Sequence, residues 1–271
     1  MSEILSLLSF AFFRNALLAA VLTSIVAGIV GSYIVARRSV FISGGITHAS
    51  FGGMGVAYFL GWPPFLGGAI FAILSALGIE WSSQKAGLRE DSAIAILWSL
   101  GMAIGILFVF LTPGYTPNLM GFLFGDILTV QLSDLYWLVG LSIVLIIVLN
   151  LFYEPIVYTA FDPEFAKVSG LPVQMIRMVV AVFIAVSIVL SIKVMGIILV
   201  LSLFAIPPSA ANLFARNFKK VILWSVIISV IGSITGLFVA YYFDLPSGAT
   251  IIFTLTAFYG VMRVLKGVSV L

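Results

Sequence analysis

The sequence predicts an all-α protein, a polytopic bundle of transmembrane helices. Three observations predict this class: the 271-residue chain is 62% hydrophobic, only 8% of it is charged, and its apolar residues form long runs. A soluble domain usually contains about 25% charged residues, because charge covers its water-facing surface. Several of the apolar runs reach about 18 residues, the length of helix that spans a bilayer. The composition therefore excludes a soluble enzyme, a nucleic-acid-binding domain and a disordered chain.

Hydropathy and helix-breaking residues divide the chain into eight or nine helices. The expected spans, in chain order, are residues 15–36, 41–60, 65–81, 92–111 and 133–153, two helices within 175–215, and then 221–242 and 248–264. Turns rich in proline and glycine separate several of them, at residues 61–64, 112–114 and 243–247. Residues 118–130 are apolar but too short to span, so we expect an interfacial or re-entrant segment there.

One apolar block, residues 175–215, is too long for a single helix. Lys193 and Gly196 divide it, and we expect Pro207 and Pro208 to break its second half, because proline cannot donate a backbone hydrogen bond. Neither a linker nor an internal repeat is visible, so we expect residues 1–271 to form a single transmembrane domain.

Lysine and arginine are unevenly distributed between the two ends of the predicted helices. All but two of the 13 Lys and Arg residues fall at one end, and only Arg14 and Lys193 fall at the other. Cytoplasmic loops of membrane proteins carry such an excess of positive charge. We therefore expect the N-terminus outside and the C-terminus inside. The outer face then carries Asp126 and Asp244, and its net negative charge should attract cations.

The only histidine of the chain, His48, lies in the second predicted span. On a helix its neighbours include Gly44, Gly45 and Gly52, so the imidazole stands in a groove with little side-chain bulk, about 10 Å from the cytoplasmic end. One interpretation is tight helix packing, with the imidazole hydrogen-bonded to a backbone carbonyl. The other is a polar station on a pathway, since neutral imidazole binds transition metals. The residues alone leave both interpretations open.

Two acids, Glu90 and Asp91, directly precede the fourth predicted span. The helix dipole stabilises acids at a helix N-terminus, which explains one acid well and two in a row less well. The alternative is a pair of oxygen ligands for a cation at the inner mouth of a pathway.

A short capped helix is expected at residues 162–170, between the fifth and sixth spans. Asp162 is a candidate N-cap, Pro163 suits the first helical position, and Gly170 suits the left-handed residue that ends a helix. Apolar side chains such as Phe165 would then be exposed on one side of it. This side can dock another protein or lie on lipid headgroups.

Four stretches of the chain together resemble the permease subunits of zinc, manganese and iron ATP-binding-cassette importers, the ABC-3 family. They are residues 37–53 around His48, residues 89–91, residues 161–170, and residues 196–211 together with 244–249. The similarity runs from about residue 15 to residue 264. One position departs from the family: many members carry an aspartate four residues before the histidine, where this chain has Gly44.

The resemblance implies a homodimeric permease in a prokaryotic cell (inner) membrane that moves zinc or manganese and binds no cofactor permanently. It implies two kinds of partner: ATPase subunits in the cytoplasm, and an extracytoplasmic metal-binding protein that delivers the ion. Within such a permease we expect His48 to contact the metal in transit and Glu90 and Asp91 to receive it toward the cytoplasm, because the only imidazole lies beside glycines on the side where the two acids begin the fourth span. Gly44, Gly45 and Gly52 would line the route. The resemblance implies that the ATPase docks on the short helix, through Asp162, Glu164, Phe165 and Gly170.

The chain itself lacks a site for ATP hydrolysis. No lysine directly follows a glycine, so there is no phosphate-binding Gly-Lys-Ser/Thr loop, and the energy should come from a partner. The alternative function is that of a secondary transporter or channel that moves a cation without an ATPase partner. Such carriers usually place charged side chains near the membrane midplane, whereas the predicted spans are nearly free of charge.

Overall fold

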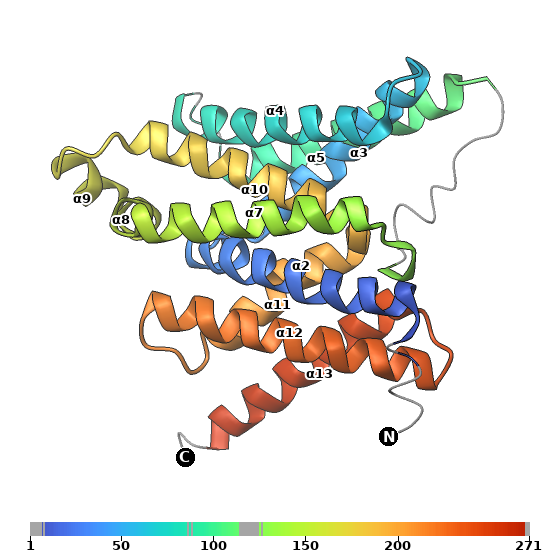
Figure 1. The fold of residues 1–271 in the computed structure, drawn as a ribbon. Coiled ribbons are helices and arrows are strands. Elements are labelled where there is room, and N and C mark those ends of the chain that lie inside the picture. The colour runs from blue at the N-terminus through green and yellow to red at the C-terminus, as the bar shows by residue number, and fades with distance from the viewer. Residues whose placement is uncertain are drawn as a thin grey trace. The chain divides into compact units, whose positions relative to one another are not determined.

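The computed structural model describes residues 7, 9–85, 87, 89–113, 125 and 127–268. Within these ranges the chain forms helices and no strand, which confirms the predicted all-α class (Figure 1). The helices are α2 Ala11–Ala36, α3 Phe41–Phe59, α4 Pro64–Lys85, α5 Glu90–Leu111, η1 Ile127–Thr129, α7 Leu132–Leu151, α8 Tyr153–Phe161, α9 Pro163–Val168, α10 Val173–Met195, α11 Ile197–Ala211, α12 Phe218–Tyr242 and α13 Ser247–Val268.

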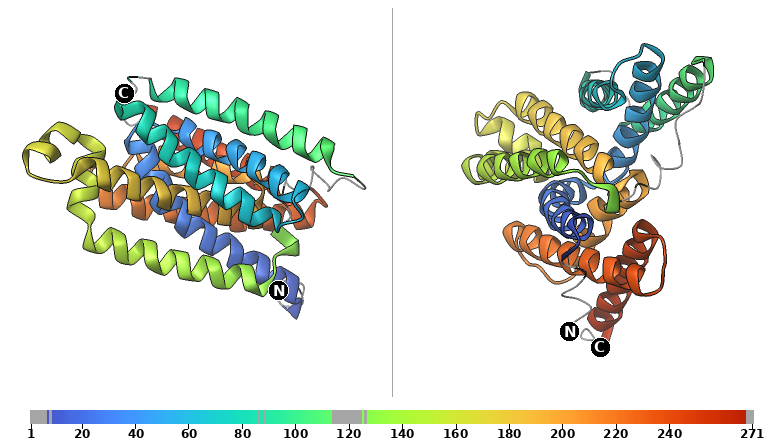
Figure 2. Two further views of the ribbon diagram at one scale, coloured as in Figure 1. Left: turned by 90° about the horizontal axis from the view of Figure 1, so that it is seen from above. Right: turned by 45° about the vertical axis from the view of Figure 1, so that its right-hand side comes forward.

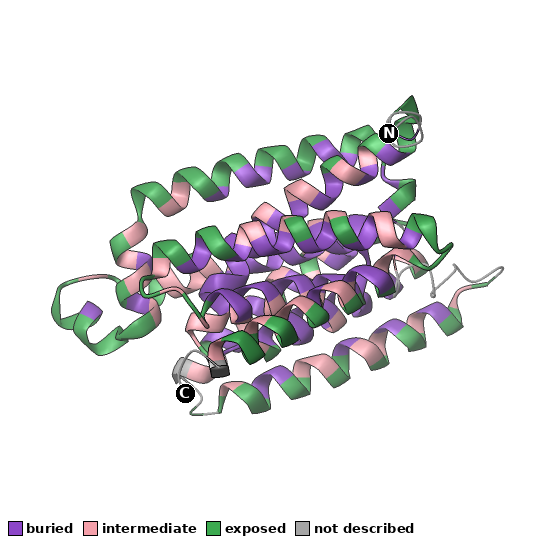
Figure 3. Ribbon diagram, turned by 90° about the horizontal axis from the view of Figure 1, so that it is seen from below, coloured by how far each residue is buried: buried purple, intermediate pink, exposed green. Residues whose placement is uncertain are grey.

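Seven of the described helices are long and apolar enough to cross a membrane: α2, α4, α5, α7, α10, α12 and α13. They expose large apolar side chains, among them Phe110, Trp137 and Phe253. Figure 3 shows exposed residues recurring along whole helices. Lipid solvates such a surface and water does not. The chain is therefore a multi-pass membrane protein.

Two apolar helices fall outside this group of seven. α3 has 19 residues, but glycine, serine, threonine and His48 make up much of it. α11 has only 15 residues. The break before α11 is the predicted one, because Gly196 adopts a left-handed φ of 78° between α10 and α11.

The prediction that Pro207 and Pro208 break the second half of this block is wrong, because both lie inside α11. In an ordinary helix the carbonyl of Phe204 accepts from the N–H of residue 208, which Pro208 lacks. Gly31 of α2 packs against this carbonyl, and a Cβ at Gly31 would lie 2.5 Å from the oxygen of Phe204. The close approach of two helices explains the glycine at this position.

The polar segment between α7 and α10 contains two helices. α9 corresponds to the short helix predicted there, whereas α8 precedes it and the sequence analysis does not predict it. Asp162 joins the two helices, since it is the C-cap of α8 and the N-cap of α9. The two helices contact each other.

The chain divides into two compact units. Unit 1 takes residues 1–32, 120–144 and 190–271, and in it α12 packs against α13 and α11 packs against both (Figure 2). Unit 2 takes residues 33–119 and 145–189, and in it α3 packs against α4 and α5. That the whole chain acts as one domain stays a prediction.

Candidate functional site

His48 lies in α3 at the contact of this helix with α5. Its ring stacks on that of Trp98, with centroids 4.3 Å apart and planes inclined by 14°. Its Nδ1 lies 3.3 Å from Sδ of Met102. Trp98 and Met102 are four residues apart and so share one face of α5. A ring nitrogen of a partly buried imidazole and a thioether sulfur therefore face each other at this contact.

The glycines around His48 allow α3 to approach α5 closely. A Cβ at Gly44 would lie 2.7 Å from the Trp98 ring, and a Cβ at Gly52 would lie 2.6 Å from the carbonyl oxygen of Gly101. Gly45 is likewise buried against α5. The geometry confirms tight helix packing at these three glycines, and their role along a metal route stays a prediction.

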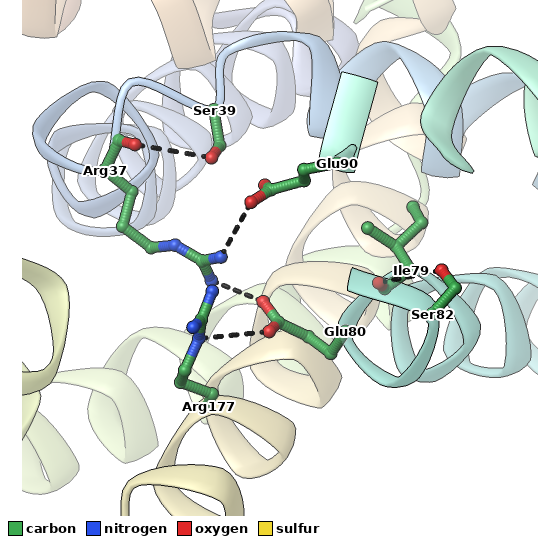
Figure 4. Close-up of polar contacts among 7 residues, drawn as sticks. All are labelled: Arg37, Ser39, Ile79, Glu80, Ser82, Glu90 and Arg177. Atoms are coloured by element: carbon green, nitrogen blue, oxygen red, sulfur yellow. Dashed lines mark hydrogen bonds and ion pairs between the residues drawn. The ribbon is translucent and has the colours of Figure 1, made fainter. Parts of the chain in front are cut away.

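Four charged side chains meet in unit 2, where α4, α5, α10 and the turn after α2 come together (Figure 4). Oε1 of Glu80 accepts a hydrogen bond from Nη1 of Arg37, and Oε2 of Glu80 lies 3.1 Å from Nε of Arg177. Arg37 also donates from Nη2 to Oε2 of Glu90 at 3.2 Å. The side chains of Glu80 and Arg37 are only 1% and 6% exposed, so each of these charges needs opposite charges beside it in place of water.

The turn after α2 directs Arg37 toward this cluster. Arg37 and Arg38 form the turn that follows the last residue of α2, Ala36, and Arg38 adopts a left-handed φ of 59°. Burial disfavours the charged form of Arg37. The pKa of its guanidinium is nevertheless raised above the ordinary value, because Tyr33, Glu80 and Glu90 surround it. Arg37 therefore carries a permanent positive charge between two carboxylates.

The structure does not bring His48, Glu90 and Asp91 together. Among the residues that the structure describes, no group of three His, Cys, Asp or Glu side chains could hold a metal ion. Glu90 faces Arg37, and Asp91 is exposed in the first turn of α5. Trp98, the stacking partner of His48, lies eight residues after Glu90, or about 12 Å along the helix. A role of these residues in passing on an ion stays a prediction.

Glu80 is a candidate that the sequence analysis misses. Its signal is a carboxylate inside the otherwise uncharged apolar run 65–81. An ionisable residue in such a run usually has a specific partner. The partners, Arg37 and Arg177, come from distant parts of the sequence, so spacing alone does not reveal them.

α9 has the capped geometry that the sequence predicts. Oδ1 of Asp162 accepts a hydrogen bond from the backbone N–H of Phe165 at 2.9 Å, and Gly170 is left-handed with a φ of 80°. Both predictions are confirmed. Phe161, Phe165 and Val168 are exposed, at 59%, 52% and 88%. The end of α8 and the short helix α9 therefore present an apolar surface.

A groove of about 800 Å³ runs from α9 to the first turns of α10. Glu164 and Lys167 of α9 line it, together with Leu171 and Met175. Arg177 also lines the groove, and its Nε faces Glu80. One arginine thus connects an open surface groove with a buried carboxylate.

Of the two residues predicted for the outer face, the structure describes Asp244, which lies in unit 1. Asp244 is exposed two residues after the end of α12, with a left-handed φ of 52° that aspartate tolerates better than most residues. A pocket of about 480 Å³ lies beside this turn and includes Pro246. Asp126 lies outside the described residues. Nearby in the sequence, Asp134 forms an ion pair with Lys193 at 2.5 Å.

Comparison with known proteins gives consistent matches over nearly the whole chain. The model of the ABC 3 transport family matches residues 9–266. An uncharacterized membrane protein of Synechocystis is 36% identical over 252 residues, which cover 93% of this chain and 90% of that protein. The manganese transport system membrane protein MntC of Halalkalibacterium halodurans is 32% identical, with 91% and 84% covered. The solved structure of PsaBC from Streptococcus pneumoniae in complex with Fab is similar with a TM-score of 0.85 and 30% identity, covering 96% of this chain and 94% of that one.

Proposed function

Because the chain belongs to the ABC 3 transport family, we propose that it is the membrane permease of an ATP-binding-cassette importer for divalent transition metal ions. The observation that carries this proposal is its likeness, over nearly the full length, to a relative named a manganese transport system membrane protein. The fold supports it too, since it is similar to that of the solved PsaBC structure. A stand-alone carrier or channel is not favoured.

Manganese or zinc is the cargo that we expect, and no permanently bound cofactor is needed. The manganese relative favours the first metal. The imidazole of His48 and the thioether of Met102 suit the softer zinc ion better than manganese. Where many family members carry an aspartate, the ring of Trp98 fills the space beside Gly44. A carboxylate ligand is therefore missing from this face of α3.

His48 is the residue that we expect to contact the ion in transit, with Glu90 and Asp91 receiving it toward the cytoplasm. α5 has residues at both proposed contact points. Trp98 and Met102 of α5 lie beside His48, and the two acids stand in the first turn of α5. In a homodimer, a second copy of the chain would offer a second imidazole, which would compensate in part for the missing carboxylate.

ATP hydrolysis is the task of a partner that docks on α9. The exposed apolar side chain of Phe165 and the groove beside α9 support this docking. Asp162 and Gly170 give the helix a defined start and stop, and Glu164 adds a charge at the groove. A preformed projecting helix loses little entropy when it binds.

The membrane topology that we propose has nine spans in a prokaryotic cell membrane, because of the eight or nine expected only an odd number places the two termini on opposite sides. α3 adds an eighth span to the seven long apolar helices, and α11 adds a ninth. The excess of Lys and Arg at one end of the helices supports an outer N-terminus and an inner C-terminus. The protein that delivers the metal would then meet the face that carries Asp244.

Reconstitution tests the proposal. The chain is purified with and without its ATPase partner, each preparation is placed in lipid vesicles, and uptake of radioactive manganese and zinc is followed. We expect uptake only when the ATPase and hydrolysable ATP are both present. Uptake by the chain alone, driven by a proton or sodium gradient, would identify a secondary transporter. The absence of ATP-driven uptake of both metals by the assembled complex would contradict the proposal.

A further inference from the structure

Glu80 is a buried carboxylate whose two oxygens face two different arginines. Oε1 accepts from Arg37, which follows α2, and Oε2 faces Arg177 on α10 at 3.1 Å (Figure 4). Arg37 continues the chain of contacts to Glu90, the first residue of α5, at 3.2 Å. Positive and negative charges alternate along this chain, and two of each sign make it neutral.

Stability is a weak reason for such a cluster. Removing charges from water costs about as much as their attraction returns, so well-packed apolar side chains often stabilise a protein equally well. Its geometry offers another reason. Arg177 lines the groove beside α9, where it is 17% exposed, and the same side chain reaches Glu80, which is 1% exposed. The cluster therefore begins at the surface where the ATPase docks and ends at the first turn of α5.

We propose that Glu80 is a positioning residue that links the ATPase-docking groove to α5, by holding Arg177 on one oxygen and Arg37 on the other. This inference rests on the proposed function, since it assumes that a partner moves the groove. α5 is the helix whose Trp98 and Met102 contact His48. The link thus connects the groove where the ATPase docks with the helix beside the metal route.

An exchange of partners explains how the link works. When the docked ATPase draws Arg177 away, Glu80 loses this ion pair in a buried place, where an uncompensated charge is costly. Arg37 is the cation beside it, and its guanidinium has several donors that can turn toward Glu80. Arg37 then releases Glu90, and the first turn of α5 becomes free to move. When Arg177 returns, Arg37 binds Glu90 again.

The test measures metal transported per ATP hydrolysed, in vesicles that contain the whole complex. Glu80→Gln keeps the shape of the side chain and removes its charge. We expect this ratio to fall about fivefold or more, which is the low end of typical coupling between sites. ATPase association and the rate of ATP hydrolysis should change little. Glu154→Gln is the matched control, because Glu154 is an exposed acid on α8 outside the cluster, and it should keep the wild-type ratio.

A double variant separates coupling from stability. Glu80→Gln with Arg177→Gln leaves Arg37 and Glu90 as a neutral pair, so the thermal midpoint should return toward the wild-type value. Coupling should stay low, because the connection from the groove is still cut. Only complexes that co-purify with the ATPase are assayed. If Glu80→Gln does not fold, the transport ratio of the double variant decides the test.

Two results would overturn the inference. One is a wild-type ratio in Glu80→Gln, and the other is a double variant that regains the wild-type ratio together with its stability. Either would reduce the cluster to charge compensation. Failure of the proposed function looks different, because the wild-type complex itself would then transport no divalent metal with ATP.

Discussion

At the scale of single residues, the surroundings of His48 suggest a transient contact with the cargo. One imidazole with a thioether beside it is a weak ligand set, which suits an ion that must leave as readily as it arrives. We predict that His48→Ala lowers the initial rate of ATP-driven metal uptake about tenfold, the effect of losing roughly 1.4 kcal/mol. Vesicles with matched amounts of assembled complex are compared. Binding of the ATPase should not change, since α9 is untouched.

Met102→Leu is the companion variant for this prediction. It keeps the apolar volume against His48 and removes the sulfur, so it tests whether the thioether matters as a ligand or only as packing. We expect a smaller loss of uptake than in His48→Ala. Full uptake by His48→Ala would assign the histidine to the packing of α3 on α5 alone.

At the scale of helices, α9 shows which features a sequence predicts well. Its N-cap Asp162 and its left-handed Gly170 act within a few residues of each other, so their spacing is enough to predict both. The pairing of Glu80 with Arg177 depends on how α4 and α10 pack, and no local pattern encodes it. Pro208 lies inside α11 although it lacks a backbone N–H, and the Phe204 carbonyl that it leaves packs against Gly31 of α2, a contact that no local pattern encodes.

The apolar surface of α9 leads to a prediction for docking. Phe165→Asp places a charge where the ATPase should offer an apolar groove, so we expect much less ATPase to co-purify and coupled hydrolysis to fall by about tenfold. The cap of α9 survives, since Asp162 accepts from the backbone N–H of residue 165, which aspartate also supplies. Phe165→Leu is the matched control and should keep the association. Normal association and hydrolysis in Phe165→Asp would place the docking surface elsewhere.

At the scale of the whole molecule, hydropathy predicts that the chain crosses a membrane many times. Only the distribution of charge predicts the orientation of the chain in the membrane. The structure agrees with the prediction of many spans, since seven helices among the described residues are long and apolar enough to cross a membrane. The predicted orientation depends on where Lys and Arg fall relative to the helix ends. α12 is suited to test it, because its 25 residues span about 37 Å, more than the roughly 30 Å of the hydrocarbon core. Arg216 precedes this helix and Asp244 follows it.

The chain contains no cysteine, so a single introduced cysteine reports its own side of the membrane. We predict that Asp244→Cys reacts with a membrane-impermeant thiol reagent in intact cells, whereas Arg216→Cys reacts only after the membrane is opened. Both positions are exposed, and the left-handed backbone at residue 244 costs a cysteine only about 1–2 kcal/mol. The opposite labelling pattern would reverse the orientation and move the surface for the metal-delivering protein to the other end of α12. Equal labelling of both cysteines in intact cells would mean that α12 does not span the membrane.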